Sequence, residues 1–202
     1  LSDGSLIVWR LAGRALESYE EKIVLRYVES LSRFQTCGVP VAGYISQSGS
    51  REVVQLLTLV DQEKAKQFDP KLGLTDTALM STVLQPGQRS IVFHSRSQIL
   101  AWYGEQAISF FYLHVGSEVA RIEIPRWLCT DPRLLDRVAA WCWFQARLAG
   151  GYPMILSEAH EHAVVRGPDR EMFYALLEQS FLRQGIAPSP SPKQWSKRVP
   201  MV

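Results

Sequence analysis

The chain has 202 residues, with 47% apolar and 21% charged residues, which is an ordinary globular composition for one sizeable domain. The net charge of +2 does not by itself indicate a nucleic-acid binder, and no apolar run approaches the roughly 20 residues that cross a bilayer. Three widely spaced cysteines argue against a disulfide framework and a cysteine zinc site, and they favour a reducing cytoplasm.

The opening residues Leu1-Ser2-Asp3-Gly4-Ser5 have neither an initiator Met nor the features of a signal peptide. We therefore expect an internal start, with an upstream segment missing. Residues 1–12 are predicted to contain a strand or its end. Apolar residues at steps of three and four predict a helix over 14–34, which Gly38 ends.

The middle of the chain alternates between helix and strand patterns. A short strand is predicted at 39–46, and Thr75 is placed to cap a helix over 76–84. The segments 107–115 and 119–124 flank a Gly116-Ser117 turn and predict a β-hairpin. A helix over 51–66 and a brief strand over 90–94 complete this part.

The last third is predicted to be helical. Residues 132–148 form one helix, Tyr152-Pro153 opens another, and a third covers about 169–184. The Pro- and Ser-rich residues 186–202 are predicted to be a flexible tail that follows a domain over 1–185. The pattern indicates a mixed α/β fold with at least one antiparallel strand pair.

Asp3 is the first candidate for chemistry. A carboxylate at a strand end can hold a hard divalent cation, and two-metal nucleases need several such carboxylates at the scissile phosphate. The alternative is an ordinary Asp-Gly turn. No phosphate-binding loop, dinucleotide-binding turn, nucleophile elbow or zinc-protease helix occurs in the sequence.

The segment from Gly151 to Ala163 carries the second candidates. Ile155, Leu156, Ala159 and Ala163 form an apolar stripe, with His160 and His162 on its two margins. Periodicity does not choose between the histidines, and either one could be a rim residue bonded to the backbone. Tyr152 and His160 would stand roughly 12 Å apart along a helix, too far to share an ion but close enough to contact one bound strand.

Two further polar sets have plain structural interpretations. Arg121 and Glu123 alternate with Ile122 and Ile124, which predicts a solvated strand face, with an Arg121 that faces a groove as the second choice. Asp76 is expected at a helix N-terminus, where its charge meets the helix dipole.

In combination and order, these segments resemble the NurA family from Leu1 to about Gly185, although each is weak alone. The resemblance rests on Asp3-Gly4-Ser5-Leu6, Pro40–Ser46, Thr75-Asp76 leading to Pro86–Ser90, Ala120–Pro125, Tyr152-Pro153 and Ala159-His160.

This resemblance implies an RNase H-like α/β fold, a mixed sheet flanked by helices, here truncated at its N-terminus. It implies a toroidal homodimer whose channel admits DNA, and a manganese-dependent nuclease, with magnesium as the alternative ion. The expected activity is exonucleolytic from 5′ ends and endonucleolytic on single strands. The expected partner in double-strand-break end resection is a HerA-type hexameric helicase-translocase.

Carried over by motif, Asp3 matches a metal-binding aspartate of the family. Tyr152 and His160 match its C-terminal active-site tyrosine and histidine, and His160 is expected to bind the metal ion or to orient the phosphate. The family's two earlier acidic residues would precede residue 1, so we expect this chain alone to be inactive or nearly so. Two alternatives stay open. One is a non-catalytic RNase H-like scaffold that docks on the translocase and guides DNA, and the other is an unrelated α/β binding domain.

Overall fold

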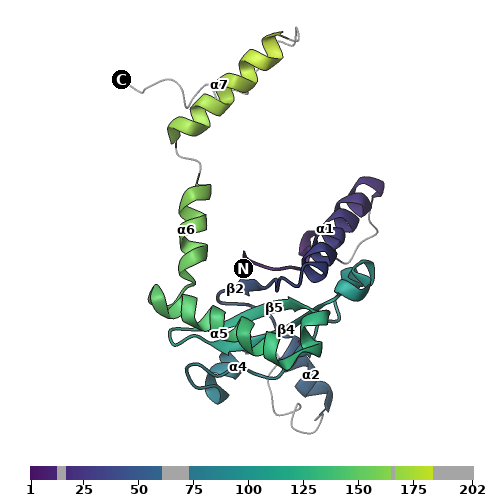
Figure 1. Ribbon diagram of the computed structural model, residues 1–202, viewed down its shortest axis with the longest axis vertical. Helices are drawn as coiled ribbons and strands as arrows, with labels where there is room; N and C mark the ends of the chain where they lie inside the picture. The colour runs from purple at the N-terminus through teal and green to yellow at the C-terminus, as the bar shows by residue number, and fades with distance from the viewer. Residues whose placement is uncertain (13–16, 61–72, 165–166, 184–202) are drawn as a thin grey trace. The chain divides into compact units, whose positions relative to one another are not determined.

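The computed structural model describes residues 1–12, 17–60, 73–164 and 167–183 (Figure 1). The chain forms two compact units, Leu1–Ala159 and His160–Val202. The predicted tail over 186–202 lies outside the described residues, as does the end of the helix expected over 51–66. In the described ranges, no helix is long and apolar enough to cross a membrane.

A five-stranded mixed sheet forms the centre of the first unit, in the order β1-β2-β5-β4-β3. The two-residue strand β1 (Ser2–Asp3) runs parallel to β2 (Gly43–Ile45), and the other neighbouring pairs are antiparallel. The predicted hairpin is confirmed, since β4 (Ile108–His114) and β5 (Val119–Pro125) pair along their whole length. The edge strand β3 spans Phe93–His94.

Helices cover both faces of this sheet (Figure 1). One face packs on α5 (Pro132–Leu148) through Ile122, Ile124 and Phe111, which are completely buried. The opposite face packs on α1 (Ser18–Thr36), α2 (Glu52–Val60) and α4 (Asp76–Val83) through two further apolar clusters. This arrangement confirms the predicted mixed α/β fold and is consistent with an RNase H-like fold.

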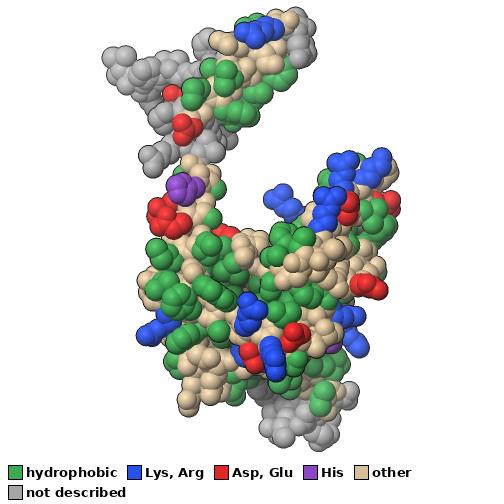
Figure 2. All heavy atoms as spheres, viewed as in Figure 1, with side chains coloured by type: hydrophobic (Ala, Val, Ile, Leu, Met, Phe, Trp, Pro, Cys, Tyr) green, Lys and Arg blue, Asp and Glu red, His purple; other side chains and the backbone are tan. Residues whose placement is uncertain are grey.

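Helix α5 is amphipathic, and its outer face is rich in aromatic residues. Its inner side buries Leu135, Val138, Ala139, Cys142 and Ala146. The outer side exposes Trp141 and Phe144, whose rings meet edge to face at 5.8 Å between centroids. Figure 2 shows hydrophobic side chains gathered on the face of the molecule where α5 lies, with Lys and Arg side chains near them.

The strand predicted within residues 1–12 is the two-residue β1, and the segment that follows it is not a strand. Leu6 and Ile7 are buried, but the Leu6 N–H donates to a Glu123 carboxylate oxygen and the Val8 N–H donates to the Tyr103 hydroxyl. Side chains thus take the hydrogen bonds that a neighbouring strand would otherwise provide. A short 3-10 helix, Trp9–Leu11, follows, and others span Gln98–Trp102, Gly104–Gln106 and Arg126–Thr130.

The helix boundaries follow local capping signals. Helix α1 begins at Ser18, where Glu17 and Glu20 form a reciprocal capping box, and the predicted start at residue 14 lies outside the described residues. The predicted Thr75 cap is confirmed, since its hydroxyl accepts a hydrogen bond from the Ala78 N–H. Helix α5 has the predicted bounds, with Asp131 as its cap.

Helix α6 (Met154–Ala163) begins in the first unit and includes the first residues of the second, which also contains α7 (Gly167–Arg183). The predicted apolar stripe on α6 is narrower than its periodicity indicates. Leu156 is buried, whereas Ile155 is 54% exposed. Of the cysteines, Cys142 is buried and Cys37 is exposed.

Candidate functional site

Asp3 lies at the C-terminal end of β1, in register with Tyr44 of the parallel strand β2. Its neighbour Gly4 has φ of 95° and donates its N–H to the Tyr44 carbonyl over 2.9 Å. A Cβ at Gly43 would lie 2.6 Å from the Gly4 carbonyl oxygen, so only glycine lets the chain turn so closely against β2. The Asp3 side chain is exposed beside this turn.

Tyr152 contacts Asp3 directly. Its hydroxyl donates a 2.8 Å hydrogen bond to Asp3 Oδ1, so the structure brings together two of the three residues singled out from sequence. Desolvation, the hydrogen bond to Asp3 and the charges of Asp3 and Glu118 raise the pKa of Tyr152 to about 12. The phenol therefore stays protonated at neutral pH and acts as a hydrogen-bond donor.

Two glycines deliver Tyr152 to this position after α5 ends. Gly150 and Gly151 have φ of 72° and 136°, a backbone path that other residues rarely take. Ser117, in the turn of the β4–β5 hairpin, donates a 3.4 Å hydrogen bond to the Gly151 carbonyl. A Cβ at Gly151 would lie 2.1 Å from Ser117 Oγ, so the hairpin turn packs closely against the residue that precedes Tyr152.

Glu118 is a member of this region that the sequence does not reveal. Its carboxylate accepts hydrogen bonds from the Tyr44 hydroxyl at 3.0 Å, the Ser46 hydroxyl at 2.7 Å and the Gln47 N–H at 3.2 Å. The Tyr44 ring meets the Tyr152 ring edge-on, with 5.6 Å between centroids. The only sequence signal for Glu118 is its place in a hairpin turn, which is also typical of a solvated residue.

His160 lies on the last turn of α6 and is the first residue of the second unit, and its side chain is exposed. His162, on the same turn, is exposed as well. The choice between these histidines and the joint action of His160 with Asp3 stay predictions.

Asp3 fits one ligand position of a divalent-cation site. It is an exposed carboxylate, and no described residue donates a hydrogen bond to its Oδ2. Hard cations take six or more oxygen ligands, and in the described part of the chain no three His, Cys, Asp or Glu side chains group to hold an ion. The described residues therefore supply a partial ligand set.

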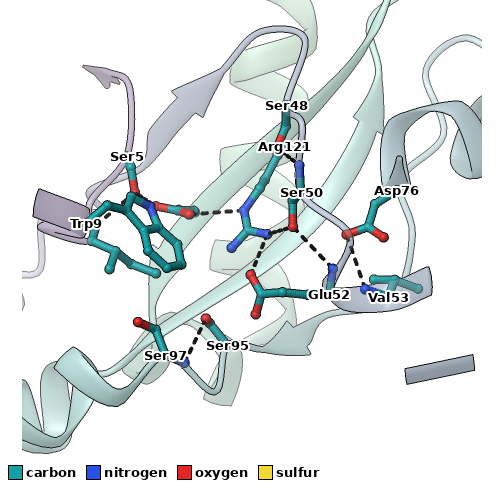
Figure 3. Close-up of polar contacts among 12 residues, drawn as sticks. Ser5, Trp9, Ser48, Ser50, Glu52, Val53, Asp76, Ser95, Ser97 and Arg121 are labelled. Carbon is teal, nitrogen blue, oxygen red and sulfur yellow. Dashed lines mark hydrogen bonds and ion pairs between the residues drawn. The ribbon is translucent and has the colours of Figure 1, made fainter. Parts of the chain in front are cut away.

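A buried ionic network lies on the face of the sheet that packs against α1, α2 and α4 (Figure 3). Arg121 is 1% exposed and Glu123 is fully buried, which shows that the predicted solvated face and the predicted groove-facing Arg121 are both wrong. Arg121 Nε lies 3.0 Å from Glu123 Oε1, and its Nη1 lies 2.8 Å from Glu52 Oε1. The guanidinium also lies 3.7 Å from the centroid of the Phe110 ring.

The charges of this network compensate for its burial. Burial alone would lower the pKa of Arg121, but Glu123 and Glu52 outweigh that effect and raise it. The second Glu123 oxygen accepts hydrogen bonds from the Ser5 hydroxyl at 2.6 Å and the Leu6 N–H at 2.9 Å. The network thus links β5 to the segment that directly follows Asp3.

Asp76 is the first residue of α4, as expected, but its carboxylate serves the neighbouring helix. It accepts hydrogen bonds from the N–H groups of Val53 and Val54 in the first turn of α2, and from the Tyr112 hydroxyl. Figure 3 shows the contact between Asp76 and Val53. The carboxylate is fully buried. Asp76 therefore joins α2, α4 and β4 rather than forming part of an exposed site.

The model of the NurA domain family matches residues 1–165, which include Asp3, Glu118, Tyr152 and His160. No curated protein and no solved structure matches the chain significantly.

Proposed function

Since the chain belongs to the NurA family of metal-dependent DNA-repair nucleases, we propose that it contributes Asp3, Tyr152 and His160 to a site that hydrolyses DNA phosphodiesters. The observation that supports this most directly is the hydrogen bond between Tyr152 and Asp3, because it joins an exposed carboxylate and a protonated phenol at one end of the sheet. His160 enters the proposal on its family motif alone.

In the proposed site, Asp3 provides a carboxylate ligand for manganese, or magnesium as the alternative, and His160 provides an imidazole for the ion or a phosphate. A bound divalent cation supplies activation of a water nucleophile and stabilisation of the leaving oxygen. Tyr152, with its pKa raised to about 12, does not act as a base; when DNA binds, its one hydroxyl proton would turn from Asp3 to a phosphate oxygen.

The outer face of α5 supports DNA as the ligand. Arg133, Arg137 and Arg147 are exposed on the helix that also exposes Trp141 and Phe144. Aromatic rings stack on unpaired bases and Arg side chains pair with phosphates, which is a combination that single-stranded nucleic acid favours. This face would contact single-stranded segments of the substrate.

The finer activity follows the family resemblance. We propose 5′ exonuclease and single-strand endonuclease activity in double-strand-break end resection. The active form would be a cytoplasmic homodimer that works with a HerA-type helicase-translocase. With a partial ligand set, the 202-residue chain alone would cut DNA little or not at all, because affinity for hard cations rises with the number of anionic oxygen ligands.

Manganese binding and cutting test the proposal separately. Paramagnetic Mn²⁺ should broaden the NMR signals of Tyr152 in the 202-residue chain, and Asp3→Asn should remove that broadening. In a form of the protein that cuts labelled DNA, Asp3→Asn should abolish cutting, whereas Asp136→Asn, at a surface ion pair with Arg89, should not. Full activity of the Asp3→Asn protein would remove Asp3 from the mechanism.

A non-catalytic scaffold is the second candidate, and the absence of a three-residue ion site among the described residues favours it. A scaffold would bind DNA and the translocase but would neither bind Mn²⁺ at Asp3 nor cut. Retained DNA binding without Mn²⁺-dependent broadening or cutting would support this function over the nuclease.

A further inference from the structure

The hairpin turn between β4 and β5 contacts Tyr44, which is in register with Asp3, and the segment that leads to Tyr152, which is hydrogen-bonded to Asp3. Glu118 accepts the Tyr44 hydroxyl hydrogen bond, and the neighbouring Ser117 contacts Gly151, which directly precedes Tyr152. Tyr44 is 1% exposed, and its ring packs edge-on against Tyr152. One short turn therefore contacts both the ring that supports Tyr152 and the backbone that leads to it.

We infer that Glu118 is a positioning residue of the proposed nuclease site. Glu118 holds the Tyr44 ring in place, and the Tyr44 ring holds the Tyr152 hydroxyl beside Asp3. This inference rests on the proposed function for its catalytic meaning, but its structural part stands on contacts alone. Glu118 itself hydrogen-bonds neither Asp3 nor Tyr152 among the described residues, so apart from its charge it acts on Tyr152 through the Tyr44 ring.

The environment of Glu118 favours such a role over that of a solvated turn residue. Its Oε2 accepts from both the Ser46 hydroxyl and the Gln47 N–H, directly after β2 ends. Gln47 has φ of 48°, in the left-handed region that non-glycine residues occupy at a cost of about 1–3 kcal/mol. The turn at Gln47 binds the Glu118 carboxylate and so holds it in one place, and the carboxylate in turn holds the Tyr44 hydroxyl.

The test follows the NMR signals of Tyr152 in ¹³C-tyrosine-labelled 202-residue chain, assigned with Tyr152→Phe. Glu118→Ala removes the acceptor, Tyr44→Phe removes the donor, and both should move the Tyr152 signal. The double variant should move it no further than the larger single change, because the two residues act in series. Glu118→Gln keeps an acceptor oxygen and should restore most of the wild-type signal. Glu105→Ala, at an exposed position, is the matched control and should have no effect.

An unmoved Tyr152 signal in both Glu118→Ala and Tyr44→Phe, with wild-type circular dichroism, would overturn the inference. If Glu118→Ala does not fold, Tyr44→Phe, the more conservative change, still decides. In a form that cuts DNA, Glu118→Ala should lower kcat on the order of 10-fold with little change in KM. A moved Tyr152 signal in a protein whose cutting does not depend on Asp3 would preserve the positioning role and refute the nuclease site.

Discussion

The Tyr152 hydroxyl lies 2.8 Å from Asp3 Oδ1, although the two residues are 149 positions apart in the chain. Three contacts place the two residues together: β1 pairs with β2, Gly151 packs closely against Ser117, and the Tyr44 ring packs against the Tyr152 ring. Each of these conditions is met by a different element of the first unit. The hydrogen bond between Tyr152 and Asp3 therefore depends on several elements, and a substitution in any of them should affect it.

Tyr152→Phe should separate the hydroxyl from the ring. The ring contact with Tyr44 is retained, so loss of the partly exposed hydrogen bond should lower the free energy of unfolding by about 1 kcal/mol or less. In a form that cuts DNA, kcat should fall on the order of 100-fold, since a positioned donor is lost. Urea denaturation and a single-turnover cutting assay measure the two effects. Unchanged single-turnover cutting would leave Tyr152 with a structural role only.

His160→Ala and His162→Ala form a matched pair on the last turn of α6. Both side chains are exposed, so neither change should alter the melting temperature appreciably. We expect His160→Ala to reduce Mn²⁺-dependent cutting at least 10-fold, an estimate from the usual contribution of a positioned histidine, and His162→Ala to leave it unchanged. If His162→Ala reduces cutting and His160→Ala does not, the active-site role belongs to His162 and the prediction is wrong.

Gly151→Ala should be much more damaging than Gly150→Ala. At Gly151 the new Cβ would meet Ser117 Oγ at 2.1 Å, whereas at Gly150 nothing lies within 4 Å. Both changes pay for positive φ, about 1–3 kcal/mol, and only Gly151→Ala adds the clash and displaces Tyr152. Thermal unfolding measures the difference. Ser117→Gly should restore part of the lost stability in Gly151→Ala but none in Gly150→Ala, and equal effects at the two glycines would contradict the close packing.

Arg121→Met should destabilise the fold by about 3–5 kcal/mol, because it leaves Glu123 buried without its cation. Arg89→Met is the control, since the Arg89–Asp136 pair is partly exposed and such pairs contribute about 1 kcal/mol or less. Urea denaturation monitored by tryptophan fluorescence compares the two. Similar losses for both variants would mean that the Arg121 network contributes no more than a surface pair.

Local signals predicted the parts of the fold that depend on neighbouring residues. The hairpin, the bounds of α5 and the Thr75 cap follow from alternation, periodicity and capping within a few positions. The burial of Arg121 and Glu123 could not be predicted in this way. Alternation identifies two faces of a strand, but α2 and α4, which cover the second face, come from distant parts of the chain.

The site shows the same division. The family resemblance is what singles out Asp3 and Tyr152, because spacing alone indicates an Asp-Gly turn and a Tyr-Pro helix start. The role of Glu118 could not be predicted from the sequence, because an acidic residue in a turn is usually solvated and its partner Tyr44 is 74 positions away. Only the assembled sheet brings the two together.

The two hydrogen bonds that Glu123 accepts from Ser5 and Leu6 also affect how Asp3 would bind a ligand. Because Glu123 lies in the middle of β5 and holds the backbone only three positions beyond Asp3, the opening turn is tied to the rigid interior before any ligand arrives. Little conformational freedom then remains to be lost when the carboxylate takes up a divalent cation. Affinity at Asp3 should accordingly depend on how many other ligands join it, not on ordering of the loop that carries it.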